Sequence, residues 1–327
     1  MNMYKQCAAL AAAFFALNGA IAQVSEKFPD RAVKIVVPYS AGGPVDSVMR
    51  ALAAKLQVRW AQPVIIENRP GANEIIGASV VAKSPADGYT IFAGTEASLT
   101  MNQFLYSKLP YNVDKDFTPI TRVINVPLAV VVPSALPVKT MHEFIAFAKT
   151  SSSKPLSYAS SGAGGFNHLP AVMLAKNEGF ELNYISYRGA APAVVDLLSG
   201  NVQVGMVAVS AIEPHVKKGT LRALAVSSEM RLPGLPDVPT FKELGIKDVG
   251  AVFGVGLVAP KGTARTVIKQ MSDEVTAILK DPDFQKEYLL PLSFVPTPYG
   301  PEEYSQFLRT NTKFQQERIA ASGVKLD

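Results

Sequence analysis

The stretch VKIVVPYSAGGPVDSVMRALAAKL, residues 33–56, contains the pattern that decides the fold. Its first five residues are a short apolar run typical of a buried strand, and a glycine loop follows at residues 40–44. From Val45 onward the apolar residues recur on one helical face, and Pro44 suits the first position of that helix. The stretch therefore predicts a strand, a glycine loop and a helix in direct succession.

Working outward from this stretch, similar units recur along the chain. Further strands are expected at residues 64–66, 90–93, 128–132, 156–159, 184–187, 202–207, 221–226 and 252–258. Helices are expected at 78–82, at 140–149 behind a capping box, from about 168, at 263–280 and at 301–320. Strands that alternate with helical patterns indicate parallel α/β sheets, in which ligands lie beyond the carboxyl ends of strands and beside helix N-termini.

Residues 1–22 have the layout of a secretory signal. Lys5 is followed by an apolar run at 8–17 and by Ala20-Ile21-Ala22, so we expect cleavage after Ala22. The run is shorter than the roughly 20 residues that span a bilayer, which disfavours a retained anchor. Because Cys7 is the only cysteine, the mature chain would contain no disulfide, no cysteine nucleophile and no thiolate metal site.

The composition indicates a packed globular protein. Hydrophobic residues make up 48% of the chain and charged residues 18%, and the remaining length exceeds what one core usually serves, so two domains are expected. The net charge of +5 is scattered, without a basic run, which disfavours nucleic acid as a partner.

The first glycine loop is a candidate anion site. Around Tyr39, Ala41 and Gly42 the backbone can approach a ligand closely, and the following helix offers free amides that suit a carboxylate. The alternative is a tight turn without a ligand. The loop lacks both the ending of a phosphate-binding P-loop and the spaced third glycine of a dinucleotide fingerprint. Asp46 either caps free amides or meets a donor group of the ligand.

A second candidate follows the strand at 156–159. Ser160, Gly162 and His168 place hydroxyls and amides at a helix start, where a histidine is disfavoured as a cation and is expected to be neutral. His168 either contacts a ligand or makes a structural hydrogen bond. Arg188 could clamp a carboxylate as a fork or could pin a loop, whereas a structural role is favoured for Arg69.

An enzyme is not predicted. Ser160, Ser161, His168 and Asp196 would suit a hydrolase, but the G-x-S-x-G elbow is missing. The three histidines lack metal-ligand spacing, so neither a metal nor a cofactor is expected.

An ordered set of short motifs runs from Phe28 to the C-terminus. The motifs are IVVPYSAGG (35–43), VIIENRPGA (64–72), DGYT (87–90), LPY (109–111), KDF (115–117), YAS (158–160), HL (168–169), YRG (187–189), LRALAV (221–226) and LPDVPT (235–240). Together they resemble the substrate-binding proteins of tripartite tricarboxylate transporters, the Bug receptors. The resemblance implies an α/β, type II periplasmic-binding-protein fold, with two lobes joined by two crossing segments and a hinge that closes on the ligand. We expect lobe 1 at 23–123 and 250–327 and lobe 2 at 124–249.

The resemblance also implies binding residues. Carboxylate contacts, partly through backbone amides and water, are expected at Tyr39, Ala41, Gly42, Asp46, Ser160, Gly162 and His168, and Thr95 and Ser98 match a third loop of the binding cleft. The chain departs from the family pattern at Pro44, at Asn73-Glu74-Ile75, where the family usually has Gly-Gly-Asn, and at Glu96. It also has Val207-Ala208 where the family often has Asp-Asn. The apolar Val207 and Val209, with Phe166, suit an apolar or aromatic ligand body and disfavour a ligand amine.

We therefore expect a monomeric periplasmic receptor that captures a small dicarboxylate or aromatic carboxylate for the membrane permease of a tripartite tricarboxylate-type transporter. The alternative is a sensor that presents the same closed form to a membrane histidine kinase. The binding site would be the same in both, so the sequence leaves this choice open.

Overall fold

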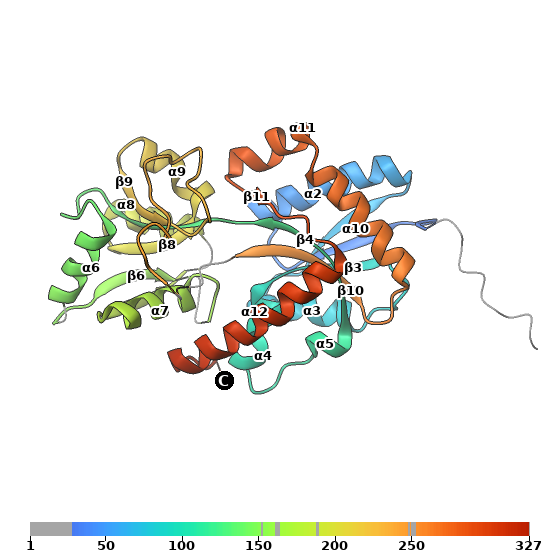
Figure 1. Cartoon of the computed structure of the whole chain (residues 1–327), viewed down its shortest axis with the longest axis horizontal. Helices are drawn as coiled ribbons and strands as arrows, with labels where there is room; N and C mark the ends of the chain where they lie inside the picture. The colour runs from blue at the N-terminus through green and yellow to red at the C-terminus, as the bar shows by residue number, and fades with distance from the viewer. Residues whose placement is uncertain are drawn as a thin grey trace, which may run out of the picture.

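The computed structural model describes residues 28–151, 153–160, 164–187, 190–247, 249 and 253–326. Two mixed sheets lie side by side along the longest axis of the molecule (Figure 1), with strand orders β11-β4-β10-β3-β1-β2 and β7-β6-β8-β5-β9. We call them sheet A and sheet B. The expected signal segment and two candidate binding residues, Gly162 and Arg188, lie outside the described residues.

Sheet A combines strands from the first part of the chain, drawn in blue to green, with strands from its last part, drawn in orange to red in Figure 1. Its strands are β1 (Val33–Val37), β2 (Val64–Asn68), β3 (Thr90–Thr95), β4 (Phe117–Asn125), β10 (Gly254–Pro260) and β11 (Val295–Pro296). The helical elements of the same two regions are α2 (Pro44–Trp60), η1 (Ala72–Glu74), α3 (Ile75–Ala82), η2 (Ala97–Met101), α4 (Asn102–Leu105), α5 (Val113–Asp116), α10 (Arg265–Leu279), α11 (Pro282–Phe284), η3 (Gln285–Leu289), η4 (Leu290–Leu292) and α12 (Pro301–Ser322).

Sheet B is built from the middle of the chain, drawn in green to yellow. Its strands are β5 (Leu128–Pro133), β6 (Leu156–Ser160), β7 (Leu182–Ser186), β8 (Val204–Ala208) and β9 (Leu221–Val226), and its helices are α6 (Met141–Thr150), α7 (His168–Glu178), α8 (Ala190–Ser199) and α9 (Val209–Lys217). Half of the capping box predicted at the start of α6 is present: the Thr140 hydroxyl accepts a hydrogen bond from the Glu143 amide at 3.1 Å, whereas the Glu143 carboxylate accepts from the Lys139 amide at 2.6 Å.

The expectation of parallel sheets was only partly right. β1 pairs in parallel with β2 and β3, and β6 pairs in parallel with β7 and β8. β10, in contrast, runs antiparallel to β3 and β4, and β5 runs antiparallel to β8 and β9. β5 and β10 are the first strands after the two points where the chain changes sheet. A strand that enters its sheet from the neighbouring one needs no crossover helix and can pair antiparallel.

Several short elements were not predicted, and neither were three longer ones, β4, α8 and α9. β4 contains Pro119, two threonines and Arg122, which interrupt the apolar run that marks a buried strand. It nevertheless lies inside sheet A because β10 and β11 pair with its two edges. β4 leads through Val126 and Pro127 directly into β5, so the first passage between the sheets is very short.

Helix α12 connects the two halves of the molecule on one side. It packs against β4 and η2 in the sheet A half and against α7 in the sheet B half, as its diagonal course in Figure 1 shows. The Lys176 ammonium of α7 donates to the Ala321 carbonyl near the C-terminal end of α12. Within the described part of the chain, no helix is both long enough and apolar enough to span a membrane.

Candidate functional site

The first glycine loop is held by the Asp46 carboxylate. Asp46 accepts hydrogen bonds from the Gly42 backbone amide at 2.9 Å, the Arg50 guanidinium at 2.8 Å and the Asn68 side-chain amide at 2.7 Å. Burial alone would raise the pKa of Asp46, but the bonds from Arg50, Asn68 and Gly42 lower it below its usual value. Gly42 has a φ of 83°, a left-handed conformation that glycine adopts without strain. Ala41 and Gly42 remain exposed, so a ligand can reach the backbone of the loop that Asp46 holds.

The carboxyl ends of β1 and β3 bring three predicted binding residues together. Tyr39 follows β1, Thr95 ends β3, and Ser98 lies in the first turn of η2. The two strands are parallel, so their carboxyl ends meet at one edge of sheet A. We call the Tyr39 hydroxyl, the Thr95 hydroxyl and amide, and the Ser98 hydroxyl the donor cluster.

The donor cluster is bound to a carboxylate of the protein itself. Glu74 Oε1 accepts hydrogen bonds from the hydroxyls of Tyr39 and Thr95. Glu74 Oε2 accepts from the Thr95 amide at 3.1 Å and from the Ser98 hydroxyl at 2.6 Å. The Glu74 residue is only 4% exposed. Burial, and after it the Glu74 carboxylate, raises the pKa of the Tyr39 phenol well above its usual value, so Tyr39 is a hydrogen-bond donor at neutral pH.

The backbone around Glu74 is strained. Ala72, Asn73 and Glu74 have φ values of 45°, 48° and 73°, a left-handed run that is unusual for residues with a side chain. The Asn73 side chain donates to Asn102 Oδ1 at 2.7 Å, and the Asn102 side chain donates back to the Asn73 carbonyl at 2.8 Å. These two bonds help to hold the strained turn that carries Glu74.

A buried ion pair lies beside the donor cluster. Glu96 Oε1 accepts from the Arg122 guanidinium at 2.7 Å, and Glu96 Oε2 accepts from the Gly254 amide at 2.7 Å. The guanidinium also lies 3.9 Å from the centroid of the Phe307 ring. Burial raises the pKa of Glu96, although Arg122 opposes that shift. The pair connects the start of η2 to β4 and β10, the two strands of sheet A next to the passages between the sheets.

On the sheet B side, the loop before α7 is fixed from within. His168 Nδ1 accepts a hydrogen bond from the Gly164 amide at 3.0 Å, and burial lowers the pKa of the imidazole. His168 is therefore neutral, as predicted, with its proton on Nε2. Ser160 is buried at the end of β6, and the Tyr187 amide donates to its carbonyl at 2.8 Å.

Three aromatic rings join the two sides, and we call them the aromatic row. Phe253, just before β10, stacks on Phe166 of the loop before α7, with ring centroids 4.3 Å apart. On its other side it meets Tyr39 edge to face, with centroids 6.4 Å apart. The aromatic row therefore runs from the donor cluster to the loop before α7, the helix that begins at His168.

Val207 and Val209 lie in the hydrophobic interior of the sheet B half. They are 3% and 0% exposed and belong to the hydrophobic core around α8 and α9. Contact of Val207 with a ligand stays a prediction. Of the apolar residues expected at the site, Phe166 is the one that the structure places in the aromatic row.

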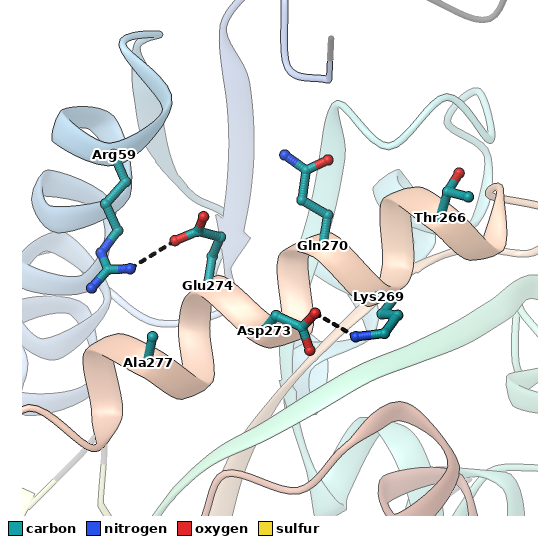
Figure 2. A pocket seen from close by; sticks show the side chains of 7 residues that line it. All are labelled: Arg59, Thr266, Lys269, Gln270, Asp273, Glu274 and Ala277. Atoms are coloured by element: carbon teal, nitrogen blue, oxygen red, sulfur yellow. Dashed lines mark hydrogen bonds and ion pairs between the residues drawn. The ribbon is translucent and has the colours of Figure 1, made fainter. Parts of the chain in front are cut away.

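A hollow on the outer face of α10 is a poor anion site because its cations are already paired. Figure 2 shows Arg59 bonded to Glu274 at 2.9 Å and Lys269 bonded to Asp273 at 2.5 Å. Among the described residues, no group of three or more His, Cys, Asp or Glu side chains could hold a metal ion.

Sequence reasoning missed the part that Glu74, Arg122 and Phe253 play at this junction. Glu74 had been noted only as a departure from a family pattern, and Arg122 lies in the strand that was not predicted. A charged residue within an otherwise apolar stretch was the available signal for Arg122. No local pattern distinguishes Phe253.

The family model of the tripartite tricarboxylate transporter family receptor matches residues 48–324. The chain belongs to this family. The protein BugT of Bordetella pertussis is 35% identical over 282 residues, which cover 86% of each chain. The R. palustris protein Rpa4515, solved with adipate, superposes with a TM-score of 0.82 at 30% identity and covers 91% of this chain and 99% of its own. MatC of Rhodopseudomonas palustris, solved with bound malate, gives 0.78 at 27% identity, with 89% and 100% covered.

Membership confirms the expected two-lobed α/β fold of periplasmic binding proteins. The chain is a periplasmic solute-binding receptor and not an enzyme. Ser160, Ser161, His168 and Asp196, which would suit a hydrolase, therefore do not form a catalytic site.

Proposed function

We propose that this receptor captures a small dicarboxylate or aromatic carboxylate between its lobes and presents it to the membrane permease of a tripartite tricarboxylate-type transporter. The aromatic row is the observation that carries the proposal. Phe253 is buried at the centre of the row, whereas Tyr39 and Phe166 at its two ends are half-buried, and aromatic rings stack well on a planar or apolar ligand body.

In this proposal the two lobes, residues 23–123 with 250–327 and residues 124–249, close on the ligand. Lobe 1 contributes Tyr39, Ala41 and Gly42, with Asp46 holding the loop in shape, and Thr95 and Ser98 behind them. Lobe 2 contributes Ser160, Gly162, Phe166, His168 and Arg188. Closure is favoured only to the extent that the ligand binds the closed form better than the open form.

The relatives support a carboxylate as the cargo. Rpa4515 was solved with adipate and MatC with malate, and both cover nearly the whole of this chain. The protein itself is expected to be exported by residues 1–22 and cleaved after Ala22.

Calorimetric titration with succinate, citrate, glutamate, nicotinate and terephthalate tests the proposal. We expect saturable binding of at least one carboxylate without an amine, and loss of its uptake in a strain that lacks the gene. A preference for glutamate would contradict the proposed cargo. Normal uptake in the deletion strain would contradict the transport role.

A further inference from the structure

Glu74 uses all the hydrogen-bonding capacity of its carboxylate. It accepts four bonds from the donor cluster, two at each oxygen, and a carboxylate offers about four lone-pair positions. The same four donors would otherwise be well placed to bind a carboxylate group of a ligand. The protein therefore carries its own anion at a point where a receptor for anionic ligands presents hydroxyl and amide donors.

The net charge of the buried groups around the donor cluster is negative. The hydrogen bonds of Glu74 within the described part of the chain come from neutral groups, whereas the nearby Arg122 is paired with Glu96. Glu74 and Glu96 lie close enough for the charge of Glu74 to raise the pKa of Glu96. A second anion placed here would meet two buried carboxylates and one guanidinium.

The position of the Glu74 side chain is built into the backbone. Its left-handed φ of 73° follows two other residues with positive φ, and the turn is held by the paired side-chain bonds of Asn73 and Asn102. Strain of this kind persists only when the surrounding contacts determine it, and it clusters at ligand sites. The turn directs the carboxylate into the donor cluster.

Resting on the proposed function and narrowing its cargo to carboxylates with one charged end, we propose that Glu74 is a specificity-determining residue that makes the receptor select a ligand with a single carboxylate. The end of the ligand that faces Tyr39 would then be uncharged, as an amide or a hydroxyl is. The ligand carboxylate would be bound at the opposite end, away from Glu74. Discrimination would come from repulsion between like charges as much as from the contacts that are made.

Matched ligands test this inference directly. Terephthalate and its monoamide, 4-carbamoylbenzoate, have nearly the same size and differ in charge at one end. Adipate and its monoamide form an aliphatic pair. By calorimetry we expect the wild-type receptor to bind the monoamide of at least one pair about ten-fold tighter than the dicarboxylate.

Variants separate the role of Glu74 from general damage to the site. Glu74→Gly suits the left-handed backbone and frees the donor cluster, so we expect the preference for the monoamide to fall by about ten-fold or to reverse. Glu74→Gln keeps the size of the side chain and removes its charge, and it should also lose the preference. Glu274→Gln, on the outer face of α10, is the control and should behave like the wild type.

The outcomes distinguish this inference from the proposed function. If the wild-type receptor binds the dicarboxylates tighter than their monoamides, the inference is wrong and the carboxylate-receptor function stands. If Glu74→Gly and Glu74→Gln keep the wild-type preference, Glu74 does not set it. If no carboxylate of either kind binds, the proposed function fails together with the inference.

Discussion

At the scale of single residues, this receptor uses buried polar groups to shape loops. Asp46 accepts one hydrogen bond from the Gly42 amide of the glycine loop and two more from Arg50 and Asn68, and His168 Nδ1 accepts from the Gly164 amide in the loop before α7. Each of these groups was a candidate for direct ligand contact. Their direct contact with a ligand stays a prediction, but the structure shows that each already has a structural task.

The burial of His168 predicts a pH dependence of stability. An exposed imidazole in the unfolded chain has a pKa of about 6.5, and burial lowers the pKa of His168 in the folded chain. Between the pKa of the folded chain and that of the unfolded chain, the unfolded state binds more protons. The burial of neutral His168 therefore contributes its full stability above about pH 6.5, and this contribution is lost as the pH falls toward the lower pKa of the folded chain. His168→Asn keeps an acceptor and cannot be protonated.

Urea denaturation at several pH values checks this prediction. From pH 7.5 to pH 5 the free energy of unfolding of the wild type should fall more steeply than that of His168→Asn. Parallel profiles would show that the burial of His168 has no energetic consequence.

At the scale of elements, the buried pair of Glu96 and Arg122 connects η2 to β4 and β10. Arg122→Met would leave the Glu96 carboxylate buried without its cation, and breaking such a pair by removing one partner costs about 3–5 kcal/mol. Loss of the guanidinium would also raise the pKa of Glu96 further, since Arg122 opposes the effect of burial. The loss of stability should therefore be smaller at pH 5, where Glu96 can be protonated, than at pH 7.5.

Denaturation of the wild type, Arg122→Met, Glu96→Gln and the double variant forms a cycle that measures the coupling. The double variant should be more stable than Arg122→Met alone, because it leaves no unpaired buried charge. A strictly additive cycle would contradict the role given to this pair.

At the scale of the whole molecule, the aromatic row joins the two halves. An aromatic pair contributes about 0.5–1.5 kcal/mol beyond the area it buries. If the row lines the closed site, Phe166→Ala should raise the dissociation constant of the bound carboxylate by about 2–10-fold. X-ray scattering should also show a smaller ligand-induced compaction than in the wild type.

Tyr288→Ala is the matched control, because Tyr288 forms a similar ring contact with Phe284, with centroids 5.1 Å apart, near the end of α10. It should leave both affinity and compaction unchanged. Equal effects of the two variants would mean that Phe166 acts only through general stability.

Much of the fold could be predicted because its signals are local. The stretch at residues 33–56 forms β1, the glycine loop and α2, and α10 and α12 begin and end within two residues of their predicted bounds. Hydrophobic periodicity, glycine and proline positions and helix caps act over a few residues, so they can be read along the chain. The family motifs added the two-lobed architecture.

What the sequence by itself determined is the position of most of the longer strands and helices, the first glycine loop, the neutral state of His168 and the class of receptor. Only the tertiary structure decided that β5 and β10 run antiparallel to their neighbours and that Arg122 is buried against Glu96. It also decided that Glu74, 35 positions from Tyr39 and 24 from Ser98, occupies the donor cluster. The physical reason is that these contacts depend on which strands become neighbours in a sheet, and no local periodicity encodes that choice.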